Sequence, residues 1–156
     1  MLAQLPKDFA AVPAALVFSF VALTLMGGNV MQGRKLHGVE YPNMYASIVT
    51  LPDGKVVTNA KDVASANTFN CIQRGHQNAL ESAFAIMTLT VVSGLAYPKT
   101  AALGLVLWST GAYIYSVQYA CGDPAKRNKG LALVKYAGLL TLLVSNLAMS
   151  FQLYTR

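Results

Sequence analysis

Four long stretches of this chain contain no charged residue, and they constrain the fold more than any other feature. They cover residues 10–31, 82–97, 100–121 and 136–154. The hydrocarbon core of a bilayer is about 30 Å thick, so a helix that rises about 1.5 Å per residue needs about 20 apolar residues to cross it. With the adjoining residues that can continue each helix, we expect membrane spans at about residues 10–31, 72–97, 100–121 and 131–154.

The composition excludes the other common classes of protein. Hydrophobic residues make up 54% of the 156 residues and charged residues 12%, whereas a soluble domain carries about 25% charged residues. A chain of this length cannot hide so much apolar surface in water, and a disordered chain would be far more polar. The first apolar run is also longer than that of a usual signal peptide. We therefore predict an all-α membrane protein with one domain over residues 1–156.

The distribution of basic residues predicts the orientation of the chain. The 12 lysines and arginines outnumber the 6 acidic residues, and most of them lie between the first and second spans or between the third and fourth. A four-transmembrane-helix bundle in up-down order brings these two connections to the same end, which the positive-inside rule places in the cytosol. Both termini then lie on the non-cytosolic side, with only Lys7, Lys99 and Arg156. The basic residues form no broad face, so we expect no nucleic-acid partner.

The polar segments between the predicted spans differ in length. The longest, residues 32–69, contains Pro-Asp-Gly at residues 52–54 and is expected to be a loop, with a short hairpin at residues 55–58 as one alternative. Between the second and third spans there is only Pro98-Lys99. This short connection predicts that these two helices form a tight antiparallel pair.

The second predicted span begins with polar residues that share one side of the helix. On a helix of about 100° per residue, six of them fall within one half-turn arc. They are Gln73, Arg74, Gln77, Asn78, Glu81 and Ser82. Charged residues cost about 2.5–3.5 kcal/mol each at mid-depth in a membrane helix, so they usually face the bundle interior or a wet cavity. Arg74 and Glu81 could serve only to hold helices together, but six polar side chains on one arc favour a functional site.

A second set of polar side chains lies at the end of the third predicted span. Tyr115, Gln118, Tyr119 and Gly122 share one helical face at i, i+3, i+4 and i+7. Tyrosines at this depth are typical of an interfacial aromatic belt, but a basic cluster at residues 126–129 follows them directly. The cluster can be a topology signal alone, or it can surround a cytosolic-edge cavity together with the tyrosines and the polar arc.

The residue types around this cavity indicate the ligand that would complement it. Arg34, Arg74 and Arg127 offer planar donors that pair bidentately with carboxylates, and Glu81 offers an acceptor for an ammonium group. The complement is a small zwitterion with more than one carboxylate. An opening toward lipid beside it would admit an apolar second substrate. Arg34 could also serve only to compensate the helix dipole and to set the topology.

Three segments of the chain resemble a known family. Residues 69–81 read Phe-Asn-Cys-Ile-Gln-Arg-Gly-His-Gln-Asn-Ala-Leu-Glu, residues 39–45 read Val-Glu-Tyr-Pro-Asn-Met-Tyr, and residues 122–127 read Gly-Asp-Pro-Ala-Lys-Arg. They resemble the MAPEG proteins, the membrane-associated proteins of eicosanoid and glutathione metabolism. Within this family they are most similar to the type-three microsomal glutathione transferases. The similarity runs over most of the chain and keeps the four spans in order.

The resemblance implies a homotrimer in the endoplasmic reticulum or a related envelope, with glutathione bound between neighbouring subunits near the cytosolic edge. Glutathione is then a co-substrate, and neither a metal nor a permanently bound cofactor is implied. The residues that the resemblance places on glutathione are Arg74, Asn78, Glu81, Tyr115 and Tyr119, while Arg34 and His76 reach the glutathione of the adjacent subunit. Arg127 matches the arginine that activates the thiol, and Lys126 is an alternative because the match needs a one-residue gap.

The implied activity is that of a glutathione transferase and peroxidase, in which the thiolate attacks a lipophilic electrophile or a lipid hydroperoxide. Membrane lipids and lipophilic substrates are therefore the expected partners. Two features depart from the family pattern: Ser82 replaces a tyrosine of several members, and residues 47–67 form a longer loop. A non-catalytic family member that presents lipid and a tetraspan scaffold are the alternatives. The physiological electrophile stays open.

Overall fold

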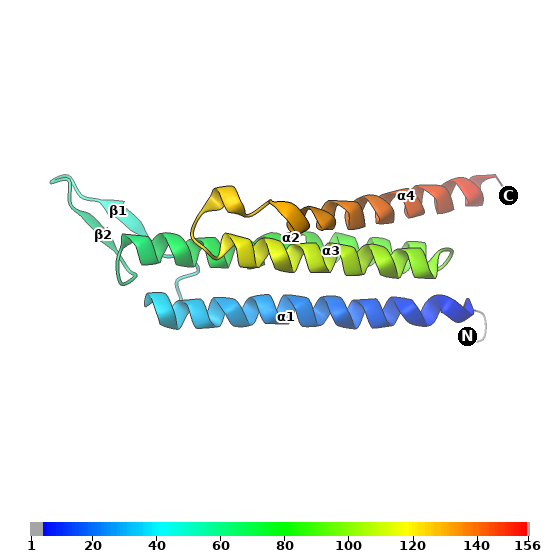
Figure 1. The fold of residues 1–156 in the computed structure, drawn as a ribbon, viewed down its shortest axis with the longest axis horizontal. Coiled ribbons are helices and arrows are strands. Elements are labelled where there is room, and N and C mark those ends of the chain that lie inside the picture. The colour runs from blue at the N-terminus through cyan, green and yellow to red at the C-terminus, as the bar shows by residue number, and fades with distance from the viewer. Residues whose placement is uncertain (1–4, 156) are drawn as a thin grey trace.

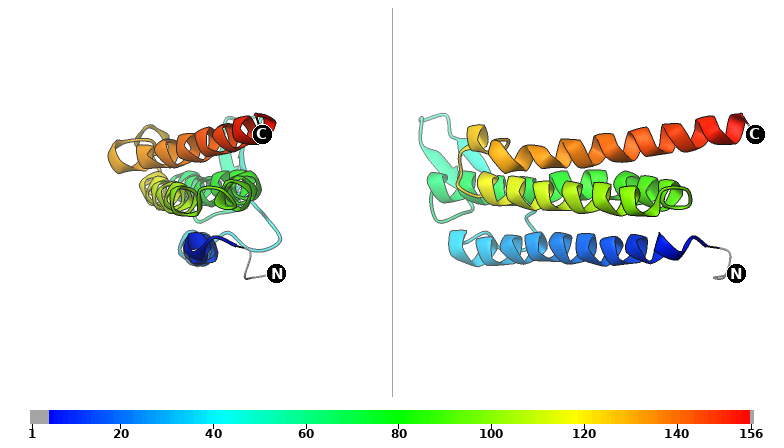
Figure 2. Two further views of the ribbon diagram at one scale, coloured as in Figure 1. Left: turned by 90° about the vertical axis from the view of Figure 1, so that its right-hand side faces the viewer. Right: turned by 45° about the vertical axis from the view of Figure 1, so that its right-hand side comes forward.

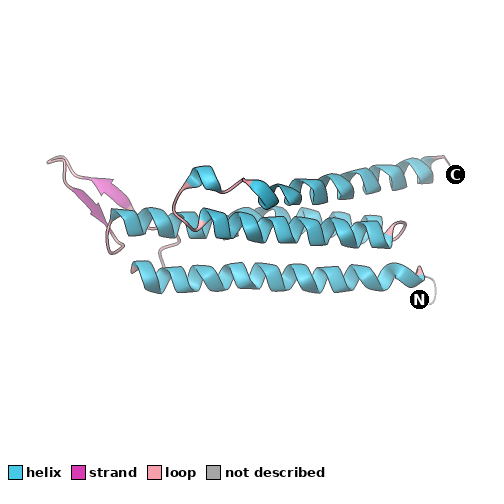
Figure 3. Cartoon of the chain, in the orientation of Figure 1, coloured by secondary structure: helices cyan, strands magenta, loops and turns pink. Residues whose placement is uncertain are grey.

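The computed structural model describes residues 5–155 and shows a bundle of four long helices with a small β-hairpin at one end (Figures 1 and 3). The elements in chain order are the 3-10 turn η2 (Lys7–Ala10), α1 (Ala11–His37), β1 (Ile48–Thr50), β2 (Val56–Thr58), α2 (Val63–Gly94), α3 (Pro98–Tyr119), the 3-10 turns η3 (Pro124–Lys126) and η4 (Gly130–Leu133), and α4 (Val134–Tyr154). The all-α expectation therefore holds apart from the hairpin. Arg156, which the sequence places on the non-cytosolic side, lies outside the described residues.

Within the described chain, three helical segments are long and apolar enough to cross a membrane. They are Lys7–His37, Pro98–Tyr119 and Gly130–Tyr154. These segments confirm the first, third and fourth predicted spans as apolar helices of membrane length. α2 has 32 residues, which at about 1.5 Å per residue give ample length for a bilayer, but its polar first half separates it from the other three. That α2 crosses the membrane stays a prediction.

Consecutive long helices run in opposite directions, so the two described ends of the chain lie at the same end of the bundle (Figures 1 and 2). The α1–α2 and α3–α4 connections lie at the opposite end, which we call the loop end, and the hairpin projects from it. This arrangement is the expected up-down order. The side of the membrane that each end faces stays a prediction.

The polar segment at residues 32–69 is not a loop throughout, and that prediction was wrong at both of its ends. α1 continues to His37 and ends at Gly38, whose φ of 72° lies in the left-handed region that favours glycine. α2 begins directly after Asp62, whose Oδ1 accepts a hydrogen bond from the Ser65 amide at 2.7 Å. The loop is therefore shorter than the sequence predicted. Polar residues mark the end of an apolar membrane span, but the helix can continue through them.

The remaining connection contains a hairpin, but it spans residues 48–58 rather than residues 55–58, where only the second strand lies. β1 and β2 pair antiparallel, with Val49 opposite Val57. The turn between them uses Gly54, whose φ is 83°, and Asp53, whose Oδ1 accepts a hydrogen bond from the Lys55 amide at 3.0 Å.

The connection between α2 and α3 consists of residues 95–97, and Pro98 is the first residue of α3. The predicted turn at Pro98-Lys99 is therefore displaced toward the N-terminus. Proline suits the first helical position, because its fixed φ fits the helix and no hydrogen bond is needed there from the missing N–H. The two helices still form the expected tight antiparallel pair.

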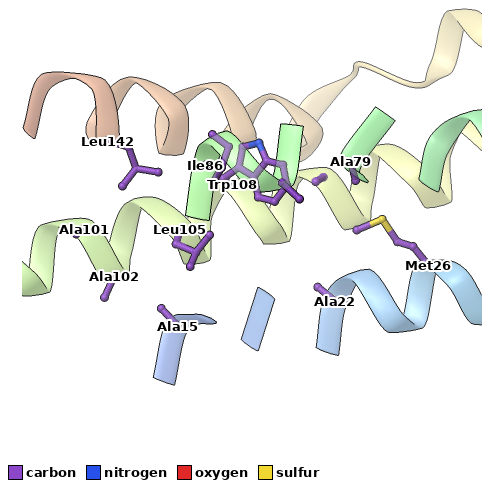
Figure 4. Packing of buried hydrophobic residues seen from close by; sticks show 12 residues of the cluster. Ala15, Ala22, Met26, Ala79, Ile86, Ala101, Ala102, Leu105, Trp108 and Leu142 are labelled. Carbon is purple, nitrogen blue, oxygen red and sulfur yellow. The ribbon is translucent and has the colours of Figure 1, made fainter. Parts of the chain in front are cut away.

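The helices pack through small and medium-sized apolar side chains near the middle of the bundle (Figure 4). The main cluster includes Ala15, Ala22 and Met26 of α1, Ala79 and Ile86 of α2, Leu105 and Trp108 of α3, and Leu142 of α4. In lipid the hydrophobic effect does not drive helices together, so close contact between small residues takes its place. The alanines let the backbones approach, and Trp108 fills the wider space toward α2 and α4.

α3 and α4 approach each other closely at glycines. A Cβ atom at Gly138 would lie 2.5 Å from the carbonyl oxygen of Gly104 and from the amide nitrogen of Trp108. A Cβ atom at Gly111 would likewise lie 2.9 Å from the Cα atom of Lys135. Both distances are too short for a real side chain. The two glycines therefore fix the position of the first turns of α4, including Lys135, against α3.

We expect Gly138→Ala to lower the free energy of unfolding by about 1–3 kcal/mol, because overpacking forces the two backbones apart. Gly28→Ala in α1 is the matched control, since nothing lies within 4 Å of its added Cβ atom, and we expect it to be neutral or stabilising. The measurement is thermal unfolding of the purified proteins in detergent micelles. Equal unfolding temperatures for the two variants would contradict the close approach.

Candidate functional site

Two cavities near the loop end contain five of the eight predicted site residues: Asn78, Tyr115 and Arg127 line one, and Arg74 and Tyr119 line the other. The inner cavity has a volume of about 570 Å³ and lies between α2, α3, α4 and the α3–α4 connection. The outer cavity has a volume of about 510 Å³ and lies between α2, the end of α3 and the α1–α2 connection. Both volumes fall within the range of about 300–1,000 Å³ that is usual for small-molecule sites.

The inner cavity is polar at one end and apolar at the other. Its polar residues are Asn78, Ser82, Tyr115, Arg127, Asn128, Lys135 and Tyr136. Its larger apolar residues are Ile86, Leu89, Trp108 and Leu139. On α2 the apolar residues follow the polar ones in the direction away from the loop end, so the apolar part lies deeper in the bundle. The cavity can therefore hold a polar group and an apolar group side by side.

Arg127 reaches the inner cavity because the α3–α4 connection folds into a tight turn. Asp123 caps η3 by accepting a hydrogen bond from the Ala125 amide at 2.9 Å. Arg127 then donates from Nη1 to the carbonyl oxygen of Pro124 at 2.6 Å, which leaves the rest of its guanidinium free to bind. Lys126, the alternative to Arg127, is exposed and lines neither cavity. Its Nζ atom lies 3.9 Å from Oδ2 of Asp123, with which it forms an ion pair.

The two tyrosines of α3 connect the cavities. Their rings pack edge to face with centroids 5.7 Å apart, and Tyr115 is buried against the inner cavity while Tyr119 lines the outer one. The guanidinium carbon of Arg127 lies 5.4 Å from the ring centroid of Tyr119. Tyr113 faces the opposite way, toward a groove beside α1. Tyr115 and Tyr119 thus share the face of α3 that borders the two cavities, and their role in binding stays a prediction.

The outer cavity is built on the first half of α2. Arg74 and Asn70 line it together with Tyr119 and with Tyr45 from the α1–α2 connection. Asn70 holds that connection in place: its Oδ1 accepts a hydrogen bond from the Ala46 amide at 2.7 Å, and its Nδ2 donates to the Ala46 carbonyl at 3.0 Å. Tyr45 also donates a hydrogen bond to a residue of the polar arc, Gln77. The loop thereby becomes one wall of the cavity.

Arg74 and Glu81 form an ion pair, in which Nη1 donates to Oε1 at 2.5 Å. Both residues belong to α2, so the pair does not hold two helices together. Their side chains are 41% and 48% exposed, and an exposed pair contributes at most about 1 kcal/mol. A ligand with a carboxylate and an ammonium group could therefore replace both partners at small cost.

The structure does not bring all predicted residues together within one chain. Arg34 lies at the end of α1, where Nη1 donates to the Asn43 carbonyl at 2.6 Å and the guanidinium carbon lies 4.3 Å from the ring centroid of Tyr41. His76 packs against Gly27 of α1, on the side of α2 away from the polar arc. Glu81 lines neither cavity and is connected to the outer one only through its ion pair with Arg74. Arg34 and His76 also line neither cavity. Their separation from the other site residues agrees with the off-arc position that the sequence indicated for His76.

The sequence assigned no site role to Lys135, which directly precedes the fourth uncharged stretch, whereas the structure places it in the lining of the inner cavity. Its ammonium nitrogen lies 3.6 Å from the ring centroid of Tyr115. The residue is only 8% exposed. A lysine in the first turn of an otherwise uncharged apolar helix was the signal that could have identified it, because such a charge needs a reason to be buried.

The comparison with known families agrees with this arrangement. The model of the MAPEG family matches residues 12–148. This range contains the residues that line both cavities and all four long helices, apart from the first residue of α1 and the last six residues of α4. The chain belongs to the MAPEG family. The MAPEG family includes glutathione transferases and peroxidases as well as non-catalytic members. Membership together with the apolar helices points to an integral membrane protein with a role related to glutathione or eicosanoids.

Proposed function

We propose that this MAPEG protein is a membrane-bound glutathione transferase and peroxidase, similar to the type-three microsomal enzymes. The observation that carries the proposal is the inner cavity, where Arg127 and Tyr115 form a polar end that continues into an apolar space. A glutathione thiol at the polar end would meet a lipophilic substrate dissolved in the bilayer at the apolar end. In this proposal the inner cavity brings the thiol and the lipophilic substrate together.

The chemical role of Arg127 follows from the properties of a thiol. A free thiol has a pKa of about 8.5, and only its thiolate is nucleophilic. A guanidinium beside the sulfur stabilises the anion, and it does so more strongly in a site shielded from water. The thiol then loses its proton to solvent near neutral pH without a dedicated general base. Arg127 is preferred over Lys126 for this role because only Arg127 lines the cavity.

The tripeptide would be held by the residues next to the thiol site. In this proposal Arg74 binds a glutathione carboxylate, Glu81 binds the ammonium group, and Asn78 and Tyr119 bind neutral polar groups. Arg34 and His76, which face away from the cavities of their own chain, would contact the glutathione of an adjacent subunit in a homotrimer. α2 would cross the membrane with its polar arc turned toward that subunit interface.

Two reactions follow from one thiolate. In the transferase reaction the sulfur forms a bond to an electrophilic carbon of the lipophilic substrate and yields a thioether. The bond from that carbon to a halogen or to an epoxide oxygen breaks, and the halide leaves or the alkoxide takes up a proton from water. In the peroxidase reaction two glutathione molecules are oxidised to the disulfide while a lipid hydroperoxide is reduced to the alcohol and water. We place the protein in the endoplasmic reticulum or a related envelope, with the loop end in the cytosol, where glutathione is abundant and the basic residues of the connections favour the inside.

A non-catalytic, lipid-presenting MAPEG protein is the second candidate. The observation that favours it is that Arg74 and Glu81 satisfy each other without a ligand. The two candidates differ in whether they bind glutathione. A lipid-presenting protein would bind lipid in the apolar part of the inner cavity and would bind no glutathione in the polar part.

The decisive test is turnover by the purified protein in lipid vesicles. We expect glutathione-dependent products from at least one of an aryl halide, an epoxide and a fatty-acid hydroperoxide, identified by mass spectrometry. Vesicles without protein and reactions with S-methylglutathione, which has no free thiol, are the controls. Absence of both turnover and glutathione binding in equilibrium dialysis would favour the lipid-presenting alternative.

A further inference from the structure

We propose that Lys135 is a second cationic group of the thiolate site, acting beside Arg127 in the inner cavity. This inference rests on the proposed function, because it assigns to Lys135 the same anion that Arg127 is proposed to stabilise. It adds a residue of α4 to a site that the sequence places on α2, α3 and the α3–α4 connection.

The first observation is that Lys135 is buried without an acidic partner. Only 8% of the residue is exposed. The ion pairs within residues 5–155 are Arg74–Glu81, Lys99–Asp8 and Lys126–Asp123, so none of them involves Lys135. Burying an unpaired ammonium group is costly, and such groups are normally paired or neutralised. An anion from a ligand would supply the missing partner.

The second observation is the charge of the inner cavity as a whole. Arg127 and Lys135 both line it, and none of its lining residues is an aspartate or a glutamate. The other titratable groups facing Lys135 are phenols, those of Tyr115 from α3 and Tyr136 from α4 itself. The only polar side chains that α2 contributes to the cavity are those of Asn78 and Ser82, and both are uncharged. A cavity with two cations and no carboxylate attracts an anion.

The third observation is that the position of Lys135 is fixed. Its backbone packs against Gly111 so closely that a Cβ atom there would lie 2.9 Å from the Lys135 Cα atom. Its ammonium nitrogen lies 3.6 Å from the ring centroid of Tyr115 and 5.0 Å from that of Tyr136. Cation–π contacts contribute up to about 2 kcal/mol when desolvated, which is less than the usual cost of burying a charge. The aromatic rings therefore orient the ammonium group but do not replace an anionic partner.

The position of Tyr115 connects Lys135 to the thiol. The phenol lies between the ammonium group and Tyr119, whose ring contacts the Arg127 guanidinium. A sulfur bound between Arg127 and Tyr115 would be within the field of both cations. An opposite charge within about 4–6 Å lowers the pKa of an acid by about 1–3 units, so the second cation should increase the thiolate fraction measurably.

The test is a pH titration of ultraviolet thiolate absorbance with glutathione bound to the full-length protein in micelles. We expect Lys135→Met, which keeps the length and the apolar stem, to raise the pKa of bound glutathione by about one unit. Lys135→Arg should keep the pKa close to that of the unmodified protein, because it retains the positive charge. A merely structural lysine would leave the pKa unchanged in both variants. Lys129→Met, at an exposed position outside the cavity, is the matched control and should change nothing.

A second measurement keeps the inference testable if Lys135→Met folds poorly. The ratio of dissociation constants for S-methylglutathione and glutathione sulfonate compares a neutral with an anionic group at the sulfur position. We expect Lys135→Gln to lower the preference for the sulfonate about tenfold and Lys135→Arg to retain it. An unchanged thiolate pKa in Lys135→Met, or an unchanged ratio in Lys135→Gln, would overturn this inference alone. No thiolate in the unmodified protein would instead overturn the proposed function.

Discussion

Replacing Arg127 with alanine is expected to lower the rate of glutathione conjugation at saturating substrate by about 100-fold or more. Removal of a preorganised group that stabilises a reacting anion typically costs about 100- to 1,000-fold in kcat. Without the guanidinium the bound thiol returns toward its free pKa of about 8.5, so the remaining activity should rise with pH over a higher range. The activity of Arg127→Lys should lie between those of the unmodified protein and Arg127→Ala, because lysine keeps the charge but lacks the planar guanidinium. Steady-state kinetics across pH measure these effects.

Lys126→Ala is the matched control for Arg127→Ala. Lys126 is the neighbouring residue in the chain, and its side chain is exposed and pairs with Asp123. We expect this variant to retain full activity. Loss of activity in Lys126→Ala with retention in Arg127→Ala would reverse the assignment of the activating residue.

The second large effect is expected from exchanging the partners of the ion pair on α2. The double variant Arg74→Glu with Glu81→Arg can form the same pair at the same helical spacing, so its unfolding temperature should match that of the unmodified protein. Its dissociation constant for glutathione should rise about 100-fold or more, because two charge-assisted hydrogen bonds, each contributing about 1.5–3 kcal/mol, are replaced by repulsion. Equilibrium dialysis with labelled glutathione gives this constant.

The ion pair at the opposite end of the bundle provides the control for this exchange. The Nζ atom of Lys99 lies 3.0 Å from Oδ2 of Asp8, and both side chains are exposed. Exchanging these two residues should change neither stability nor glutathione binding. If the exchange of Arg74 and Glu81 left glutathione affinity unchanged, the pair would be structural only, and the proposed binding mode would be wrong.

The helices could be predicted from the sequence because uncharged runs of membrane length leave few alternatives, but their ends could not. α1 continues through Arg34 to His37, and α2 begins at Val63 rather than near residue 72. Helix ends beyond the membrane are decided by local caps such as Gly38, and Asp62 at the start of α2 acts in the same way. The positions of such caps do not depend on the hydropathy pattern that identifies the spans, so that pattern does not predict the helix ends.

The part of the candidate site that lies on a single helix could be predicted from the sequence. Helical periodicity placed Arg74 and Glu81 on one arc, and the structure shows them paired. Lys135 was missed because its contact with Tyr115 depends on how α3 and α4 lie against each other, and the sequence of either helix alone does not reveal this. The hydrogen bond that Arg34 donates to the Asn43 carbonyl likewise depends on the path of the α1–α2 connection. The roles of all these residues in binding and catalysis stay predictions.

The measurement that tests the central claim most directly is the ultraviolet difference spectrum of the purified protein on addition of glutathione at neutral pH. The account predicts a thiolate band that saturates with glutathione, is absent with S-methylglutathione, and is lost in Arg127→Ala. If glutathione produced no thiolate band at any concentration, or if Arg127→Ala gave the same band as the unmodified protein, the account of the inner cavity as a thiolate site would be contradicted.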